Sequence, residues 1–304
     1  MISCTEFIPL YSELFKYLEE LGGHEEVVRH WEAISDSTIS DSLGGAVAEK
    51  DIRGCWDYWS KSLNEEACDF RMELDEEAGT FLIDMRRCPS KGHLLDYPHV
   101  EPYYDYCGHC PALYDRVLAK YGIRPAGHDL THTDEARCMF RYASEHKIPG
   151  GAHLSMDRLA SDNEYFHRAF HISKNRGLNY LGTHWGTAHV ITHLTRFARV
   201  FYAPLISRIR QNGLSELQAH IENTYLAEKT PELVTCHLTD TNLHVSVSKC
   251  PGISFIRAAG YEVSPWYKEE INTVFRVIAE DAGYHFRLIS YNTETGACEY
   301  LVYR

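Results

Sequence analysis

Long apolar runs and an excess of basic residues are both missing from this sequence of 304 residues. No stretch approaches the ~20 apolar residues that a membrane-spanning helix needs. The formal net charge of -13 argues against nucleic acid, because its phosphates attract basic surfaces, and equally against an anionic membrane surface. We therefore expect neither nucleic acid nor a membrane among the partners of this protein.

Several sequence motifs are absent as well. There is no GxGxxG, no P-loop GKS/T and no GxSxG, so no motif supports a nucleotide-dependent enzyme or a serine hydrolase. The opening MISCTEFIPLYSELF lacks a basic n-region and a small-residue cleavage site, which predicts a cytoplasmic protein. In that reducing compartment we expect the ten cysteines to be ligands, nucleophiles or core residues rather than disulfides.

What the sequence does contain is enough apolar material for two compact cores. Hydrophobic residues make up 44% and aromatic residues 12% of the chain. A chain of this length exceeds what one hydrophobic core usually organises, so two units are expected. The cysteines concentrate in the first half, and the 18 histidines are a high number for one chain.

The chain also repeats itself once. Cys88 aligns with Cys250, each followed by proline, and Cys138 aligns with Cys298, with the separation drifting by only two residues between the pairs. Further upstream, His30 aligns with His193. Ordered matches of this kind indicate a duplicated unit. We predict a first module over 1–148, a linker over 149–159 and a second module over 160–304.

Each module follows the same order of expected elements. Apolar residues at three- and four-residue spacing predict helices first, and segments of alternating polarity around turn residues predict a hairpin, then a helix, then a second hairpin. This order predicts an α+β fold with an antiparallel sheet in each module. The expected helices are 7–22, 24–35, 40–62 and 108–121, then 162–182, 186–210, 213–227 and 266–281; the closing hairpins join 126–131 with 137–143 and 284–291 with 297–303.

The stretch YYDYCGHCPALY (103–114) carries the densest chemistry, because Cys107, His109 and Cys110 fall within four positions. The expected helix begins here, and the unpaired N–H groups of a helix N-terminus favour a thiolate. His109 is then either the base for a neighbouring thiol or a further ligand. Catalysis, metal binding and simple packing of these cysteines all stay open at this point, since cysteine is among the most buried residue types.

The duplication separates these cysteines from the others. Cys107, His109 and Cys110 align with lysine, glutamate and isoleucine in the second module, so this cluster exists in a single copy. A single-copy cluster in a duplicated frame is the best candidate for a site. Catalytic residues would be Cys107, His109 and Cys110, and Zn or another transition metal would be held by soft thiol ligands: Cys88, Cys107, Cys110 and Cys138.

Histidines and tyrosines supply candidates for substrate binding. His167 and His171 stand four residues apart, as do His189 and His193, so each pair can share one helix face. A metal site between two such helices is conceivable, and hydrogen-bonded residues lining a polar pocket are the alternative. The residues assigned to substrate binding are Tyr106, His128, His171 and His193.

At RRCPSKGHL, YYDYCGHC and HTDEARCMFRY the sequence resembles the L-2-amino-thiazoline-4-carboxylic acid hydrolase-like family. The second half, from FHISKNRGLNYLGTHWG to SYNTETGACEYLVY, is similar to the same module without the CxHC. A more distant likeness links the layout to vinyl-reductase-type small-molecule-binding domains. The resemblance implies ring opening, in which water adds to the C=N of a cyclic amidine-like thiazoline and a C–N or C–S bond then breaks.

These observations lead to one leading hypothesis and one alternative. The leading hypothesis is a hydrolase that opens or cleaves a small cyclic C–N substrate, with either Cys/His or a metal ion assisting. The alternative is a non-enzymatic sensor or carrier that holds a small molecule or a metal. The partner is in both cases a small molecule; the sequence leaves the oligomeric state open, with a homodimer as one arrangement.

Overall fold

The structure is a computed structural model that describes all residues from 1 to 304. Its chain divides into two compact units. The N-terminal unit is Phe15–His167, and the C-terminal unit combines Met1–Leu14 with Arg168–Arg304. The boundary after Leu14 lies inside the first long helix, α1 (Phe7–Gly22).

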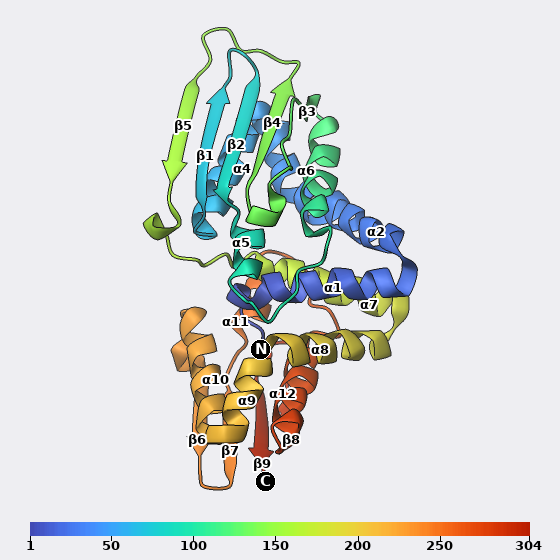
Figure 1. The fold of residues 1–304 in the computed structure, drawn as a ribbon, viewed down its shortest axis with the longest axis vertical. Helices are drawn as coiled ribbons and strands as arrows, with labels where there is room; N and C mark the ends of the chain where they lie inside the picture. The colour runs from blue at the N-terminus through green and yellow to red at the C-terminus, as the bar shows by residue number, and fades with distance from the viewer. The chain divides into compact units, whose positions relative to one another are not determined.

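The N-terminal unit builds one antiparallel sheet of five strands in the order β3-β4-β2-β1-β5. Alternate residues of β1 and β2 are buried, as expected for a sheet with one covered face. Trp59 of the covering helix α4 (Ile52–Glu65) stacks on Phe81 of β2 with ring centroids 5.5 Å apart. Figure 1 shows the five strands side by side: β1 (Asp69–Asp75), β2 (Thr80–Arg87), β3 (Ile123–Pro125), β4 (Cys138–Ser144) and β5 (His153–Arg158).

Helices precede the first hairpin of this unit and separate it from the later strands. The region 35–44 is π-helical and leads into two α-helices. The helical elements are α2 (His24–Ile34), η2 (Ser35–Gly44), α3 (Gly45–Lys50), α4 (Ile52–Glu65), α5 (Pro89–Leu95), η3 (Tyr106–Gly108), α6 (His109–Ala119), η4 (Thr133–Glu135) and η5 (Ala160–Asp162).

The C-terminal unit has a four-stranded antiparallel sheet in the order β6-β7-β9-β8. Its helices again come before and between two hairpins (Figure 1). The elements are η1 (Cys4–Glu6), α7 (Phe170–Trp185), α8 (Thr187–Phe201), α9 (Ala203–Asn212), α10 (Ser215–Ala227), η6 (Pro231–Leu233), β6 (Val234–Leu238), β7 (Asn242–Val247), α11 (Pro251–Ala258), α12 (Glu269–Asp281), β8 (His285–Tyr291) and β9 (Cys298–Tyr303).

Each unit therefore combines helices with an antiparallel sheet, which confirms the predicted α+β fold. Without β5, the strand order of the N-terminal unit is the order of the C-terminal unit, with β3, β4, β2 and β1 in the places of β8, β9, β7 and β6. Cys88 and Cys250 each cap a short helix that opens with proline. These matches support the duplication expected from the sequence.

Backbone conformation gives independent support for the duplication. Five positions with positive φ recur in both units, and their separation along the chain falls steadily from 163 to 160 residues. Residues with a side chain rarely adopt this conformation. Four of them do so in this chain, and all four fall in these pairs, so coincidence is a poor explanation. The pairs are Gly23 with Gly186, Asp51 with Gly213, Ala67 with Lys229, Gly122 with Gly283 and Ala136 with Gly296.

The predicted boundaries differ from those of the structure. Residues 149–159 do not form a linker, because β5 lies within them and pairs with β1 along its length. The first fourteen residues pack with the C-terminal unit rather than with the first module. Sequence alignment of the repeats could not reveal either fact, since β5 has no counterpart and residues 1–14 are placed by tertiary contacts.

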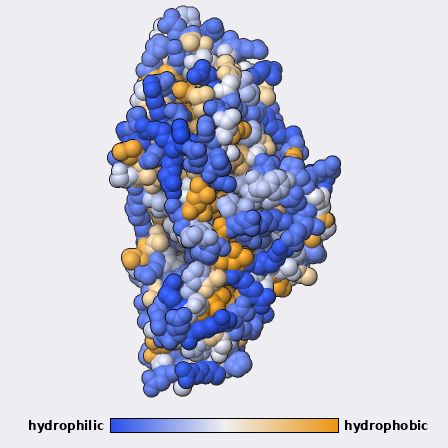
Figure 2. Space-filling view, in the orientation of Figure 1, coloured by the Kyte–Doolittle hydropathy of each residue, from blue (hydrophilic) through white to orange (hydrophobic).

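Several predicted elements also begin or end elsewhere. The helix expected over 162–182 starts only at Phe170, and the one expected over 186–210 is two helices that meet at Tyr202, next to a proline at the start of α9. The strand expected over 126–131 lies at Ile123–Pro125 instead. No helix combines the length and apolar character needed to span a membrane, and the face in Figure 2 is largely hydrophilic with small apolar patches.

Candidate functional site

Four cysteines that were predicted to act together, Cys88, Cys107, Cys110 and Cys138, come together in the N-terminal unit and are called the thiol cluster below. Cys88 caps α5 and Cys138 opens β4, while the other two lie in η3 and the first turn of α6. They line one small cavity of about 20 Å³, together with His109 and Tyr106. All four cysteines are partly exposed, so the cluster reaches the surface.

The backbone explains why distant cysteines meet. The N–H of Cys88 donates to the carbonyl of Ala136 at 2.6 Å, which ties the end of β2 to the turn before β4. Cys138 then pairs with Met85 across the β2–β4 ladder. The strand end, the turn and the start of α6 thus converge on one side of the sheet.

Burial and mutual proximity hold the four thiols in their neutral form. Burial, followed by the charge that Cys88 would carry, raises the pKa of Cys107 to about 12. The pKa of Cys110 is raised well above its usual range by the same two causes and by Cys107. Without a cation between them, these groups are therefore thiols at neutral pH, so any nucleophile among them needs a base.

His109 has the orientation that such a base requires. Its Nδ1 donates to the carbonyl oxygen of Tyr106, so the neutral ring leaves Nε2 as the acceptor. That Nε2 lies 3.4 Å from the Sγ of Cys110. Burial lowers the pKa of His109 to about 4, and the imidazole is consequently unprotonated at neutral pH.

The four thiols lie farther apart than the ligands of a closed metal site. Zn–S bonds of about 2.3 Å bring the thiolates of a closed tetrahedral site within about 4 Å of one another. The thiol cluster does not place three ligand atoms within 4.8 Å of one another, whereas a different set in the C-terminal unit does. A metal in the thiol cluster would have to draw the side chains inward.

Tyr106 and His128 were both assigned to substrate binding, but only one of them lines the thiol cavity. Tyr106 is 1% exposed and lines the thiol cavity. His128 does not line it: its Nε2 lies 3.2 Å from Asp115 Oδ1, and its Nδ1 accepts from the backbone of Arg141. His128 therefore joins strand and helix, and no substrate role follows from its position.

Only one of the two expected histidine pairs shares a helix. His167 precedes α7 and bonds Glu65 at 2.8 Å in the N-terminal unit, while His171 lies in α7 in the C-terminal unit. The i, i+4 argument for them was wrong because the helix starts at Phe170. His189 and His193 do share α8, and His193 is buried there.

Sequence reasoning missed a cluster in the C-terminal unit. Cys4, His171 and Glu228, called the Cys–His–Glu cluster below, bring one ligand atom each within 4.8 Å of one another, and all three are buried. The imidazole Nε2 of His171 lies 3.0 Å from Glu228 Oε2. The backbone N–H of Cys4 donates to Glu228 Oε1 at 2.6 Å.

A signal for this cluster was present in the repeat. Glu228 is the C-cap of α10, and Glu66 is the C-cap of α4 at the matching place in the N-terminal unit. Each is followed by a residue with positive φ, Lys229 or Ala67. A glutamate kept before such a turn in both modules could have been singled out, but its burial follows only from the fold.

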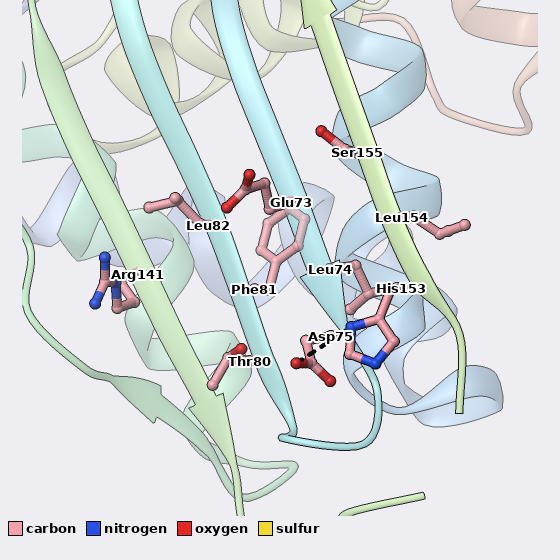
Figure 3. A pocket seen from close by; sticks show the side chains of 10 residues that line it. All are labelled: Glu73, Leu74, Asp75, Thr80, Phe81, Leu82, Arg141, His153, Leu154 and Ser155. Carbon is pink, nitrogen blue, oxygen red and sulfur yellow. Dashed lines mark ion pairs between the residues drawn. The ribbon is translucent and has the colours of Figure 1, made fainter. Parts of the chain in front are cut away.

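Another pocket lies on the open face of the five-stranded sheet. It has a volume of about 430 Å³ and is lined by residues of β1, β2, β4 and β5. Figure 3 shows Glu73, Asp75, Arg141 and His153 among the side chains that line it, and His153 pairs with Asp75 at 3.3 Å. Its histidine, His153, pairs with a carboxylate rather than with a hydroxyl of the lining, so we do not place the chemistry there.

Comparisons with known proteins add no assignment. The chain matches no protein-family model, no curated protein and no solved structure.

Proposed function

We propose that the protein is a hydrolase that opens a small cyclic C–N substrate, of amidine or thiazoline type, at the thiol cluster. One observation carries the proposal: the Tyr106 carbonyl holds His109 so that its unprotonated Nε2 faces the Cys110 thiol at 3.4 Å. A nucleophile, a base and a group that orients the base are the three parts of a thiol-dependent hydrolytic site.

The reaction would run in two steps with a net addition of one water. Cys110 Sγ adds to the carbon of the C=N bond, and the proton of the thiol passes to His109 Nε2. The ring C–N or C–S bond to that carbon then breaks, the departing ring atom takes this proton from His109, and the carbon stays bound to Cys110 as a thioimidate. Water attacks the thioimidate carbon with His109 accepting its proton, the carbon–sulfur bond to the enzyme breaks, and the departing Cys110 sulfur takes the proton back from His109.

The second module supports the choice of site. Its counterparts of Cys88 and Cys138, which are Cys250 and Cys298, are only 5% and 3% exposed. The counterparts of His109 and Cys110 are Glu270 and Ile271. Only the N-terminal unit therefore combines solvent-reached thiols with an imidazole.

The test is turnover of a panel of cyclic amidines and thiazolines by the full chain. We expect Cys110→Ser and His109→Gln to lower kcat by about 10²–10⁴-fold, the usual contribution of general base catalysis. Cys236→Ser, a partly exposed cysteine of β6, is the control and should retain full activity. Full activity in both Cys110→Ser and His109→Gln would refute the proposal.

A second candidate is a metal-binding sensor or carrier, because four thiols line one small cavity. Soft thiolates select Zn²⁺ and similar ions. Elemental analysis of protein purified without oxygen separates the two candidates. Metal that disappears in Cys88→Ser and Cys138→Ser but remains in His109→Gln favours the metal centre. The hydrolase instead predicts that turnover is lost in His109→Gln and is less affected in Cys88→Ser and Cys138→Ser.

A further inference from the structure

The residues buried around α7 in the C-terminal unit form a polar cluster that the proposed hydrolase does not use. It contains the Cys–His–Glu cluster and a second group in which Lys174 pairs with Glu270 at 2.8 Å. His171 and Lys174 are neighbours on α7, one turn apart. Polar groups so deeply buried are costly unless each has a partner.

Some of their atoms have no partner. His171 Nδ1, Tyr267 OH and Glu270 Oε1 are buried without a hydrogen bond. His171 Nδ1 and Tyr267 OH approach the same point: a Cβ on Gly252 would lie 2.8 Å from the first and 2.4 Å from the second. A native structure seldom leaves several such atoms together, so the cluster calls for a functional explanation.

The ligand chemistry suggests one. Thiolate sulfur, imidazole nitrogen and carboxylate oxygen are the three donor types that proteins offer to Zn²⁺. Here one of each lies within 4.8 Å of the others. The separation of 3.0 Å between His171 Nε2 and Glu228 Oε2 fits two ligands of one ion, whose bonds are each about 2.0–2.2 Å long.

The surroundings orient these ligands. The Cys4 N–H bonds Glu228 Oε1 and leaves Oε2 toward the imidazole. Metal on Nε2 would place the ring proton on Nδ1, which is the nitrogen on the side of Tyr267. Ligating histidines commonly direct their second nitrogen at a polar partner in this way.

We propose that the C-terminal unit binds a Zn²⁺-type divalent metal through Cys4 Sγ, His171 Nε2 and Glu228 Oε2. The three ligands come from η1, the first turn of α7 and the C-cap of α10. The ion joins segments that no β-ladder connects, and it anchors the first residues, of which Ile2 and Cys4 are 0% and 1% exposed. Its role is therefore structural.

The decisive experiment uses Co²⁺ as a spectroscopic substitute for Zn²⁺ in the full chain carrying Cys107→Ser and Cys110→Ser. These changes disable the thiol cluster, so any remaining bound ion belongs elsewhere. We expect one Co²⁺ per chain with a thiolate-to-metal charge-transfer band, and X-ray absorption showing one sulfur among nitrogen and oxygen ligands. A chain that keeps no Co²⁺, or keeps it without sulfur, refutes the proposal.

Ligand variants in the same background complete the test. Cys4→Ser, His171→Gln and Glu228→Gln should each weaken Co²⁺ binding by more than the roughly 10–100-fold that loss of an outer-shell partner costs. Cys236→Ser is the matched control and should bind as before. Folded Cys4→Ser protein with unchanged affinity contradicts the assignment, and if that variant fails to fold, the sulfur count of the parent protein decides. Turnover at the thiol cluster is measured separately in chains with that cluster intact.

Discussion

The two units share a sheet order and a set of unusual backbone positions, yet they fill equivalent places with different chemistry. Helices α6 and α12 occupy equivalent places in the two units. The first turn of α6 has His109 beside Cys110, and the first turn of α12 has Glu270 beside Ile271. His109 faces a thiol, whereas Glu270 pairs with the buried Lys174. A duplicated backbone thus leaves its side chains free to take separate roles.

Glu66 and Glu228, the C-cap glutamates at matching places in the two units, differ in their electrostatic surroundings. Burial raises the pKa of Glu66, with the charge of His167 as the main opposing influence. Burial acts on Glu228 as well, but hydrogen bonds from His171 and the Cys4 backbone outweigh it and lower its pKa to about 2. The same backbone place therefore holds a carboxyl that resists ionisation in one unit and favours it in the other.

The largest difference between the units should appear when the buried ion pair is broken. Glu270→Gln leaves the Lys174 ammonium, which is 1% exposed, without its counter-charge, and should lower the free energy of unfolding by about 3–5 kcal/mol. His109→Gln, the matching change in the N-terminal unit, removes no charge and should cost about 1 kcal/mol. Urea denaturation measures both.

A double variant controls this prediction. Lys174→Met with Glu270→Leu removes both charges and should recover most of the loss, because apolar residues of similar volume often replace a buried pair without cost. If Glu270→Gln alone unfolds within about 1 kcal/mol of the parent protein, the pair is not buried as the structure shows.

The next effect tests the turn before β4 and its counterpart before β9, where Ala136 and Gly296 both have positive φ. A Cβ on Gly296 would lie 2.4 Å from Cys250 Cβ. Gly296→Ala should therefore cost about 2–4 kcal/mol, from overpacking and left-handed strain together. Thermal or chemical unfolding is the measurement.

The reverse change supplies the comparison. Ala136→Gly relieves strain but frees the unfolded chain, two effects that nearly cancel, so its stability should change by less than about 1 kcal/mol. If Gly296→Ala changed the stability as little as Ala136→Gly does, the two turns would be packed alike, contrary to the structure.

If the thiol cluster binds a metal ion, a smaller effect on metal affinity should distinguish Cys88 from its counterpart Cys250. Cys88→Ser should weaken Zn²⁺ binding by the N-terminal unit by about 100-fold or more, since it removes a thiolate. Cys250→Ser, at the equivalent cap, should leave that binding unchanged. Competition with a coloured chelator gives both affinities, and equal losses would remove the distinction between a site and its structural copy.

The smallest effect concerns pH. Burial lowers the pKa of His167, but the hydrogen bond to Glu65 and the charge of Glu66 outweigh it and raise the pKa above its usual 6.5. The protonated pair therefore stabilises the N-terminal unit fully below that value, and the contribution disappears as pH rises through the raised pKa. The size should be about 1 kcal/mol or less, because Glu65 is partly exposed and screened.

His167→Gln is the control for that pH dependence. Unfolding midpoints of the two proteins should converge as pH rises from about 5.5 to about 8.5, the range in which histidine titrates. Cys4 stands 163 positions before His167, which is the separation of the repeat at Gly23 and Gly186. Burial raises the pKa of this thiol further from neutrality, so Cys4 gives no matching dependence. Parallel pH profiles for the two proteins would contradict the prediction.

Much of the fold and part of the site could be predicted from the sequence. Hydrophobic periodicity and the repeat predicted the elements and their order because these depend on neighbouring residues. The meeting of Cys88 with Cys107 and Cys110 was also expected, since a strand end and a helix start converge in this layout, whereas the place of Cys138 depended on the strand register. The start of α7 was not expected, and that error paired His167 with His171 wrongly.

What the amino-acid sequence determined by itself was the α+β character, the doubling of the module and the single-copy placement of the CxHC, all of which are properties of order along the chain. Only the tertiary structure decided that Cys4 meets His171 and Glu228, and that β5 joins the first sheet. The physical reason is that such contacts join residues up to 224 positions apart. No local pattern encodes their distance, because it depends on how whole helices and strands pack.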